Sequence, residues 1–142
     1  MRERVVLSVE DRDSDFLILR LALKDLDLPY RLYRVEDGET GLGFLRRGAG
    51  HEDAPRPDLI ISNINMPKKN GLELLTEIKS DPSLKSIPVV MFTLARDGSD
   101  KEIALHLGAS EFICKTPNIE ELFETLKTAC LRLLTTRDAA SA

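Results

Sequence analysis

Five apolar runs of strand length recur along the chain, and a stretch with helical spacing of its apolar residues follows each of them. The runs occupy residues 4–9, 30–35, 58–63, 87–93 and 111–114. Parallel strands need long crossover connections, and an amphipathic helix is the usual one. The repeat therefore predicts a parallel sheet that is covered by helices on both faces.

The connecting helices are predicted from apolar residues spaced three and four positions apart. They fall in residues 14–26, 38–48, 71–81, 99–109 and 118–134. The run at 30–35 alternates apolar and polar residues, which suits an edge strand, whereas the runs at 4–9, 58–63 and 87–93 are almost continuously apolar. We therefore predict a flavodoxin-like, doubly wound α/β fold with five parallel strands in the order 2-1-3-4-5 and five helices.

The length of 142 residues predicts a single domain, residues 1–142, with its core at about 4–133 and a frayed tail at 136–142. With 20 Lys and Arg against 24 Asp and Glu, the chain lacks a broad basic surface for nucleic acid. It also lacks a membrane-spanning apolar stretch, and its first residues turn acidic where a signal peptide would continue apolar. We therefore expect a cytoplasmic protein that binds neither nucleic acid nor membrane. Cys114 and Cys130 have no metal-like spacing and are expected to be buried.

Polar side chains stand where four of the predicted strands end. Glu10 and Asp11 follow the first strand, Asn63 ends the third, Thr93 ends the fourth and Lys115 follows the fifth. Each has an ordinary explanation as a helix cap, a strand end or a solvated lysine. The carboxyl ends of parallel strands meet at one edge of a doubly wound sheet, where such folds bind ligands. The agreement of all four ends therefore points to one functional crevice.

Several stretches, in this order and spacing, resemble the receiver domain of response regulators in two-component signalling. They are VVLSVEDRDSD, PDLIISNINMPKKNGLELL, IPVVMFT, GASEFICK and the final helix, and the resemblance covers about residues 4 to 133. Among receivers, the chain looks most similar to the small single-domain regulators that partner bacterial phytochromes. The resemblance implies the metal-binding acids at Glu10 and Asp11 and a metal-binding backbone carbonyl at Asn65. It places Asn63 where the family has its phosphoryl-accepting aspartate.

The same resemblance implies a switch hydroxyl at Thr93, a rotating aromatic at Phe112 and a phosphate-binding lysine at Lys115. Ser62 and Leu94 depart from the residues usual in the family next to the acceptor and switch positions. An engineered aspartate-to-asparagine substitution would leave typical neighbours. These departures therefore favour natural divergence, although an engineered form of a phosphorylatable receiver remains an alternative.

The amide at residue 63 changes the chemistry that the resemblance implies. An amide oxygen is uncharged and cannot form an acyl phosphate, so we expect no phosphorylation at Asn63. One lost carboxylate is expected to weaken Mg²⁺ binding without abolishing it, because Glu10, Asp11, Asn65 and the Asn63 oxygen remain as ligands.

These features predict a stand-alone receiver protein without enzyme activity that acts by binding a sensor histidine kinase or a phytochrome-like photoreceptor. A homodimer is expected through the face formed by residues 99–109, 111–114 and 118–134. Two alternatives stay open. One is a Mg²⁺-dependent phosphoreceiver or phosphatase-like protein that uses the remaining acids, and the other is a small-ligand binder that reuses the crevice.

Overall fold

The computed structural model describes residues 2–94 and 98–141, with the backbone alone for residues 137–141. Its strands form one parallel sheet in the order β2-β1-β3-β4-β5. Their bounds are β1 Arg4–Val9, β2 Tyr30–Val35, β3 Leu59–Ser62, β4 Val89–Thr93 and β5 Glu111–Cys114. The strand order is the predicted one, and β2 lies at the edge as its alternating sequence indicated.

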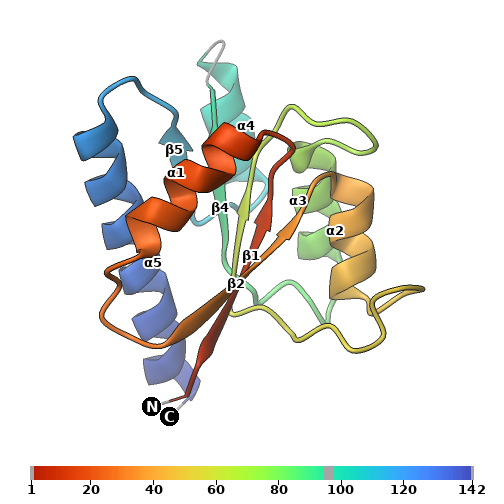
Figure 1. Ribbon diagram of the computed structural model, residues 1–142. Helices are drawn as coiled ribbons and strands as arrows, with labels where there is room; N and C mark the ends of the chain where they lie inside the picture. Colours follow the sequence, from red (N-terminus) through yellow and green to blue (C-terminus); the bar gives the residue numbers. More distant parts are fainter. Residues whose placement is uncertain (1, 95–97, 142) are drawn as a thin grey trace.

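The helices cover both faces of the sheet (Figure 1). One face carries α1 Asp13–Leu23 and α5 Ile119–Ser141, and the other carries α2 Gly38–Leu45, α3 Gly71–Ser80 and α4 Ser99–His106. Adjacent residues of a central strand face opposite cores, as Val6 packs towards α1 and α5 while Leu7 packs towards α2 and α3. The central strands are therefore mostly apolar, because side chains on both faces are buried.

Four predicted helix ends differ from the structure by three residues or more. α2 ends at Leu45 and α4 at His106, each three residues before its predicted end. α1 ends at Leu23, and the Lys24 and Leu26 amides bond three residues back, in tight turns before Pro29. α5 continues beyond Leu134 to Ser141, where a frayed tail was predicted from residue 136. The sequence there, TTRDAAS, contains neither glycine nor proline and includes good helix formers, so nothing in it stops the helix.

The two cysteines differ in exposure. Cys130 is buried, as predicted, and burial raises the pKa of its thiol to about 12. Cys114 lies exposed at the end of β5, so the prediction that it is buried was wrong. None of the helices in the part of the chain that the structure describes has the length and apolar character needed to cross a membrane.

Candidate functional site

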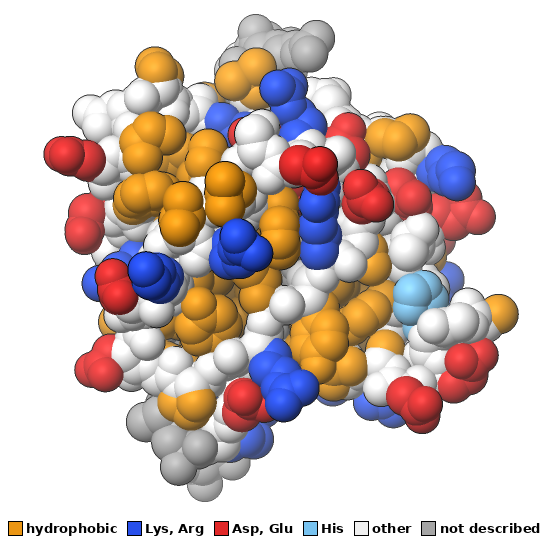
Figure 2. All heavy atoms as spheres, in the orientation of Figure 1, with side chains coloured by type: hydrophobic (Ala, Val, Ile, Leu, Met, Phe, Trp, Pro, Cys, Tyr) orange, Lys and Arg blue, Asp and Glu red, His pale blue; other side chains and the backbone are white. Residues whose placement is uncertain are grey.

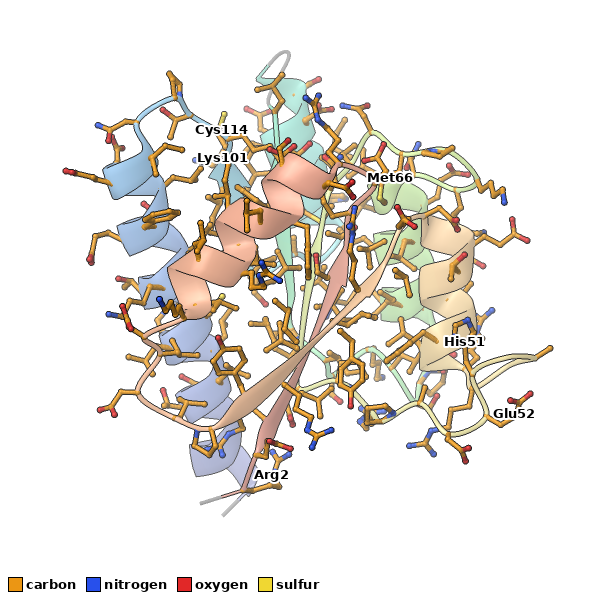
Figure 3. All side chains as sticks on the ribbon, in the orientation of Figure 1. Arg2, His51, Glu52, Met66, Lys101 and Cys114 are labelled. Atoms are coloured by element: carbon orange, nitrogen blue, oxygen red, sulfur yellow. The ribbon has the colours of Figure 1, made fainter. Side chains whose placement is uncertain are left out.

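The predicted crevice residues are held in place because the sheet's hydrogen bonding continues just past the strand ends. The Glu10 amide donates to the Val35 carbonyl at 2.9 Å, and the Asn63 amide donates to the Val9 carbonyl at 3.0 Å. The strands run parallel, so these ends meet at one edge of the sheet. In Figure 3, Met66 lies near this edge of the sheet and Arg2 lies near the opposite edge.

A hollow of about 360 Å³ opens at this edge, between α1 and the loop that joins β5 to α5. Its polar wall includes Asp11, Asp15, Asn63, Thr93 and Lys115. Its apolar wall is formed by Ile18, Leu94, Pro117 and Leu122. The structure thus brings together the predicted side chains from four separate strand ends.

The Asn63 side chain lies at the centre of the site and is buried. Its Nδ2 donates to Glu10 Oε2, to Asp11 Oδ1 and to the backbone oxygen of Asn65, each at 3.2 Å. Its Oδ1 accepts from the Thr93 hydroxyl at 2.8 Å and from the Ile64 amide at 2.9 Å. Every neighbour of the nitrogen is an acceptor and both neighbours of the oxygen are donors. The surroundings therefore specify which way the amide points.

This orientation decides how well the site fits a metal ion. The three oxygens that Asn63 Nδ2 contacts belong to Glu10, Asp11 and Asn65, the same groups that the resemblance assigns to the metal. The Asn63 oxygen, expected from the sequence as a further ligand, instead faces Thr93. Across residues 2–94 and 98–141, no cluster of three acidic, histidine or cysteine side chains could hold a metal ion. As arranged, the Asn63 nitrogen lies among the three oxygens, so a cation that bound them would first have to displace it.

Lys115 is bound on the other side of the site. Its Nζ donates to Glu10 Oε1 at 3.0 Å and to Asp15 Oδ2 at 2.9 Å. It also lies 5.2 Å from the centre of the Phe92 ring. Asp15 was not predicted from the sequence as a site residue, yet it is the second carboxylate that binds Lys115. Asp15 had little signal in the sequence, because Asp11 lies before the start of α1 and an acid in the first turn of a helix is ordinary.

Glu10 is an acid whose side chain is only 3% exposed, so its negative charge is poorly solvated. Burial raises the pKa of Glu10 above the usual glutamate value of 4.5, while Lys115 and the backbone amide of Arg12 act to lower it. A buried carboxylate is stable only when paired and hydrogen-bonded. Lys115, Asn63 and Arg12 together supply those partners.

Other singled-out residues lie outside this network. Phe112 is half-buried in β5 and packs against the core on the α2, α3 and α4 face, away from the hollow's lining. Ser62 is buried, and its hydroxyl donates to the Asn63 carbonyl at 2.8 Å. Leu94 is 51% exposed at the hollow. Thr93 therefore contacts Asn63 directly, and Lys115 contacts its neighbour Glu10. Phe112 lies away from this network.

The loop between β3 and α3 holds Asn63 in position through a close backbone approach at Gly71. The Gly71 amide donates to the Ile64 carbonyl at 2.8 Å. A Cβ at residue 71 would lie 2.0 Å from the Asn63 carbonyl oxygen, so no side chain fits there. The loop is also fastened to α2, because the Gly38 amide donates to the Lys69 carbonyl at 3.1 Å.

Gly71→Ala is expected to lower the free energy of unfolding by about 3 kcal/mol, because a backbone atom must move to relieve the clash. Gly43→Ala is the matched control. Its Cβ would make ordinary contact with the His51 side chain at 3.5 Å, within a helix that favours alanine. Urea unfolding of both variants measures the difference. Equal midpoints for Gly71→Ala and the parent chain would show that the approach does not constrain the loop.

Comparison with known proteins agrees with this architecture. The family model described as "Response regulator receiver domain" matches residues 6–127. Response regulator Rcp1 of Synechocystis sp. (strain ATCC 27184 / PCC 6803 / Kazusa) is 35% identical over 124 residues, which cover 87% of this chain and 84% of that protein.

Two solved structures share the fold. The phosphorylated cyanobacterial phytochrome response regulator RcpA superposes with a TM-score of 0.88 at 35% identity and covers 95% of this chain and 96% of its own. The Mn²⁺-bound form of response regulator Rcp1 superposes with a TM-score of 0.83 at 34% identity and covers 88% of this chain and 90% of its own. The flavodoxin-like fold predicted from the sequence is thereby confirmed.

Proposed function

The chain belongs to the response regulator receiver domain family, and from this premise we propose that it signals by binding a protein partner without being phosphorylated at residue 63. One observation carries the proposal: the Asn63 amide donates to Glu10, Asp11 and Asn65 and accepts from Thr93. A neutral amide stands where the family's mechanism needs a carboxylate nucleophile. Its hydrogen-bonding groups are already satisfied by the protein.

We propose that Glu10, Asp11 and the Asn65 carbonyl keep the shape of a metal site that binds Mg²⁺ only weakly. A cation has to displace the Asn63 nitrogen, which sits 3.2 Å from all three oxygens. It also finds two carboxylates there instead of three. Each missing unit charge at short range is worth on the order of a few kcal/mol in such a site.

We propose that Thr93 and Lys115 hold the positions of the switch hydroxyl and the phosphate-binding lysine, although other residues of the chain already occupy both side chains. The Thr93 hydroxyl is bound to Asn63 Oδ1, and Lys115 is bound to Glu10 and Asp15. Phe112, the proposed switch aromatic, is half-buried in the core. The network is complete within the chain, which supports a single resting arrangement that responds to a partner.

The proposed partner is a sensor histidine kinase or a phytochrome-like photoreceptor in the cytoplasm, since RcpA is a phytochrome response regulator. Figure 2 shows hydrophobic side chains gathered over α1 and the adjoining part of α5. Exposed ones on these helices are Leu17, Leu21 and Ile119. Such an apolar patch beside the crevice supports recognition by a protein.

A second copy of the chain is also proposed as a partner, through the face formed by α4, β5 and α5. The exposed Ile103 and Leu105 of α4 support this proposal. The net charge of −4 supports a protein partner over nucleic acid.

Incubation with Mg²⁺ and acetyl phosphate, followed by intact mass measurement, tests the proposal. We expect the mass of the parent chain to stay unchanged, because residue 63 offers no nucleophile. Asn63→Asp under the same conditions is the positive control and is expected to gain one phosphoryl group. A stable phosphoryl gain by the parent chain would instead support the Mg²⁺-dependent phosphoreceiver alternative.

A further inference from the structure

A second hollow, of about 350 Å³, lies at the edge of the sheet opposite the crevice. It is lined by Leu45, Arg46, Arg47, Arg56, Ser83 and Leu84. In Figure 3, His51 and Glu52 mark the loop that leads away from this end of α2, far from Met66. Three arginines and no acid stand among its described lining residues, in a chain whose net charge is −4.

Arg47 occupies a backbone position that favours glycine. Its φ is +52°, in the left-handed region. It follows the C-cap of α2, where the Gly48 amide bonds to the Gly43 carbonyl and the Arg47 amide bonds to the Phe44 carbonyl. Helices that end in this hydrogen-bond pattern usually have glycine at the left-handed position. An arginine held there against its conformational preference points to a use for its side chain.

Two of the three arginine side chains, those of Arg47 and Arg56, are held by backbone carbonyls, and Arg56 Nη2 also donates to the Ser86 hydroxyl at 3.2 Å. Arg47 Nε donates to the Ala54 carbonyl at 2.9 Å, and Arg56 Nη1 donates to the Ser83 carbonyl at 2.6 Å. Arg46 Nε lies 3.6 Å from Asp81. Within the described structure, the terminal nitrogens of Arg47 have no hydrogen-bond partner.

Asp81 forms an ion pair with Arg46 and so offsets the charge of one of the three arginines. Asp81 accepts from the Ser83 amide at 2.9 Å and from the Ser83 hydroxyl at 2.7 Å, so its charge is shared with that turn. Glu52 accepts from the Gly50 amide within its own loop at 2.9 Å. The hollow therefore keeps a positive rim above an apolar floor formed by the buried Leu45 and Leu84.

We propose that this hollow binds a soluble phosphate monoester with a small apolar group. Planar guanidinium groups match the oxygens of phosphate in paired hydrogen bonds, and phosphate carries enough charge for more than one arginine. The leucine floor would contact the organic group. The volume lies at the lower end of the range of about 300–1,000 Å³ for small-molecule sites. The site is separate from the crevice and does not depend on the function proposed there.

Phenyl phosphate is a suitable probe, with binding measured by calorimetry and by NMR shifts of the arginine Nε–H groups. We expect saturable binding with a Kd of about 1 mM. Arg47→Gly is expected to raise that Kd at least about tenfold. Glycine suits the left-handed backbone, so the melting temperature of this variant should equal or exceed that of the parent chain.

Arg20→Gln is the control, since it removes the same charge from the exposed surface of α1. It is expected to change the Kd of phenyl phosphate less than about twofold. Benzoate tests the ligand class and should bind at least about tenfold more weakly than phenyl phosphate. The proposal is overturned by the absence of saturable binding up to about 10 mM, by equal weakening in Arg20→Gln, or by equal affinity for benzoate.

Discussion

Asn63→Asp is expected to make the stability of the folded chain depend on a divalent cation. The substitution replaces the N–H donors that bridge Glu10, Asp11 and the Asn65 carbonyl with a third acidic oxygen. Without a cation, the repulsion among the carboxylates should lower the free energy of unfolding by on the order of a few kcal/mol. Thermal unfolding in EDTA and in Mg²⁺ measures the effect. Mg²⁺ should raise the melting temperature of Asn63→Asp far more than that of the parent chain.

Asn118→Asp is the control variant, because it makes the same chemical change at a position where a carboxylate is favourable. The Asn118 side chain is exposed and accepts from the Glu121 amide at 3.1 Å, at the N-terminus of α5. Aspartate is an equally good cap there and also interacts favourably with the helix dipole. We expect no loss of stability and no Mg²⁺ response from this control. If Asn63→Asp in EDTA melted with the parent chain, the amide would not be holding the acids together.

Lys115→Met is expected to lower the free energy of unfolding at pH 7 by about 3 kcal/mol, because removing one partner of a buried ion pair leaves the other charge uncompensated. Glu10 is 3% exposed and Lys115 is 10% exposed, so water cannot replace the lost ammonium. The loss should shrink as the pH falls. Lys115 lowers the pKa of Glu10 in the parent chain, so its removal raises that pKa further above 4.5.

The sign follows from proton uptake. When the folded pKa of an acid exceeds the unfolded one, the folded state binds more protons between the two values, and stability rises as pH falls through the folded pKa. Urea unfolding at pH 7 and at about pH 5 therefore separates this electrostatic cost from lost packing. Lys101→Met, on the exposed face of α4 (Figure 3), is the control and should show neither the loss nor the pH dependence. A loss of equal size at both pH values would contradict the assignment to Glu10.

The fold could be predicted because the central strands are buried on both faces. Runs such as residues 4–9 and 58–63 are almost continuously apolar, as is typical of parallel strands that lie between two helical layers. The helix ends were less predictable. α1 ends at Leu23 through local turns, and α5 continues to Ser141 because nothing in its last residues breaks a helix.

The position of the crevice could be predicted because parallel strand ends meet at one edge. The direction of the Asn63 amide could not be predicted, because it depends on which neighbours are donors in three dimensions. Asp15 was missed for a related reason, since an acid in the first turn of α1 looks like an ordinary helix-dipole residue. The left-handed φ of Arg47 has no sequence signal at all, because glycine is the residue expected there.

The satisfied amide at Asn63 also bears on how long a signal can last. An acyl phosphate would give each activated molecule a lifetime that is set by the rate of hydrolysis. A side chain that forms no such bond keeps no chemical record of an encounter once its partner leaves. On the proposed function, duration is therefore set by the dissociation rate and by the partner's abundance, and residence times in protein complexes extend from milliseconds to days.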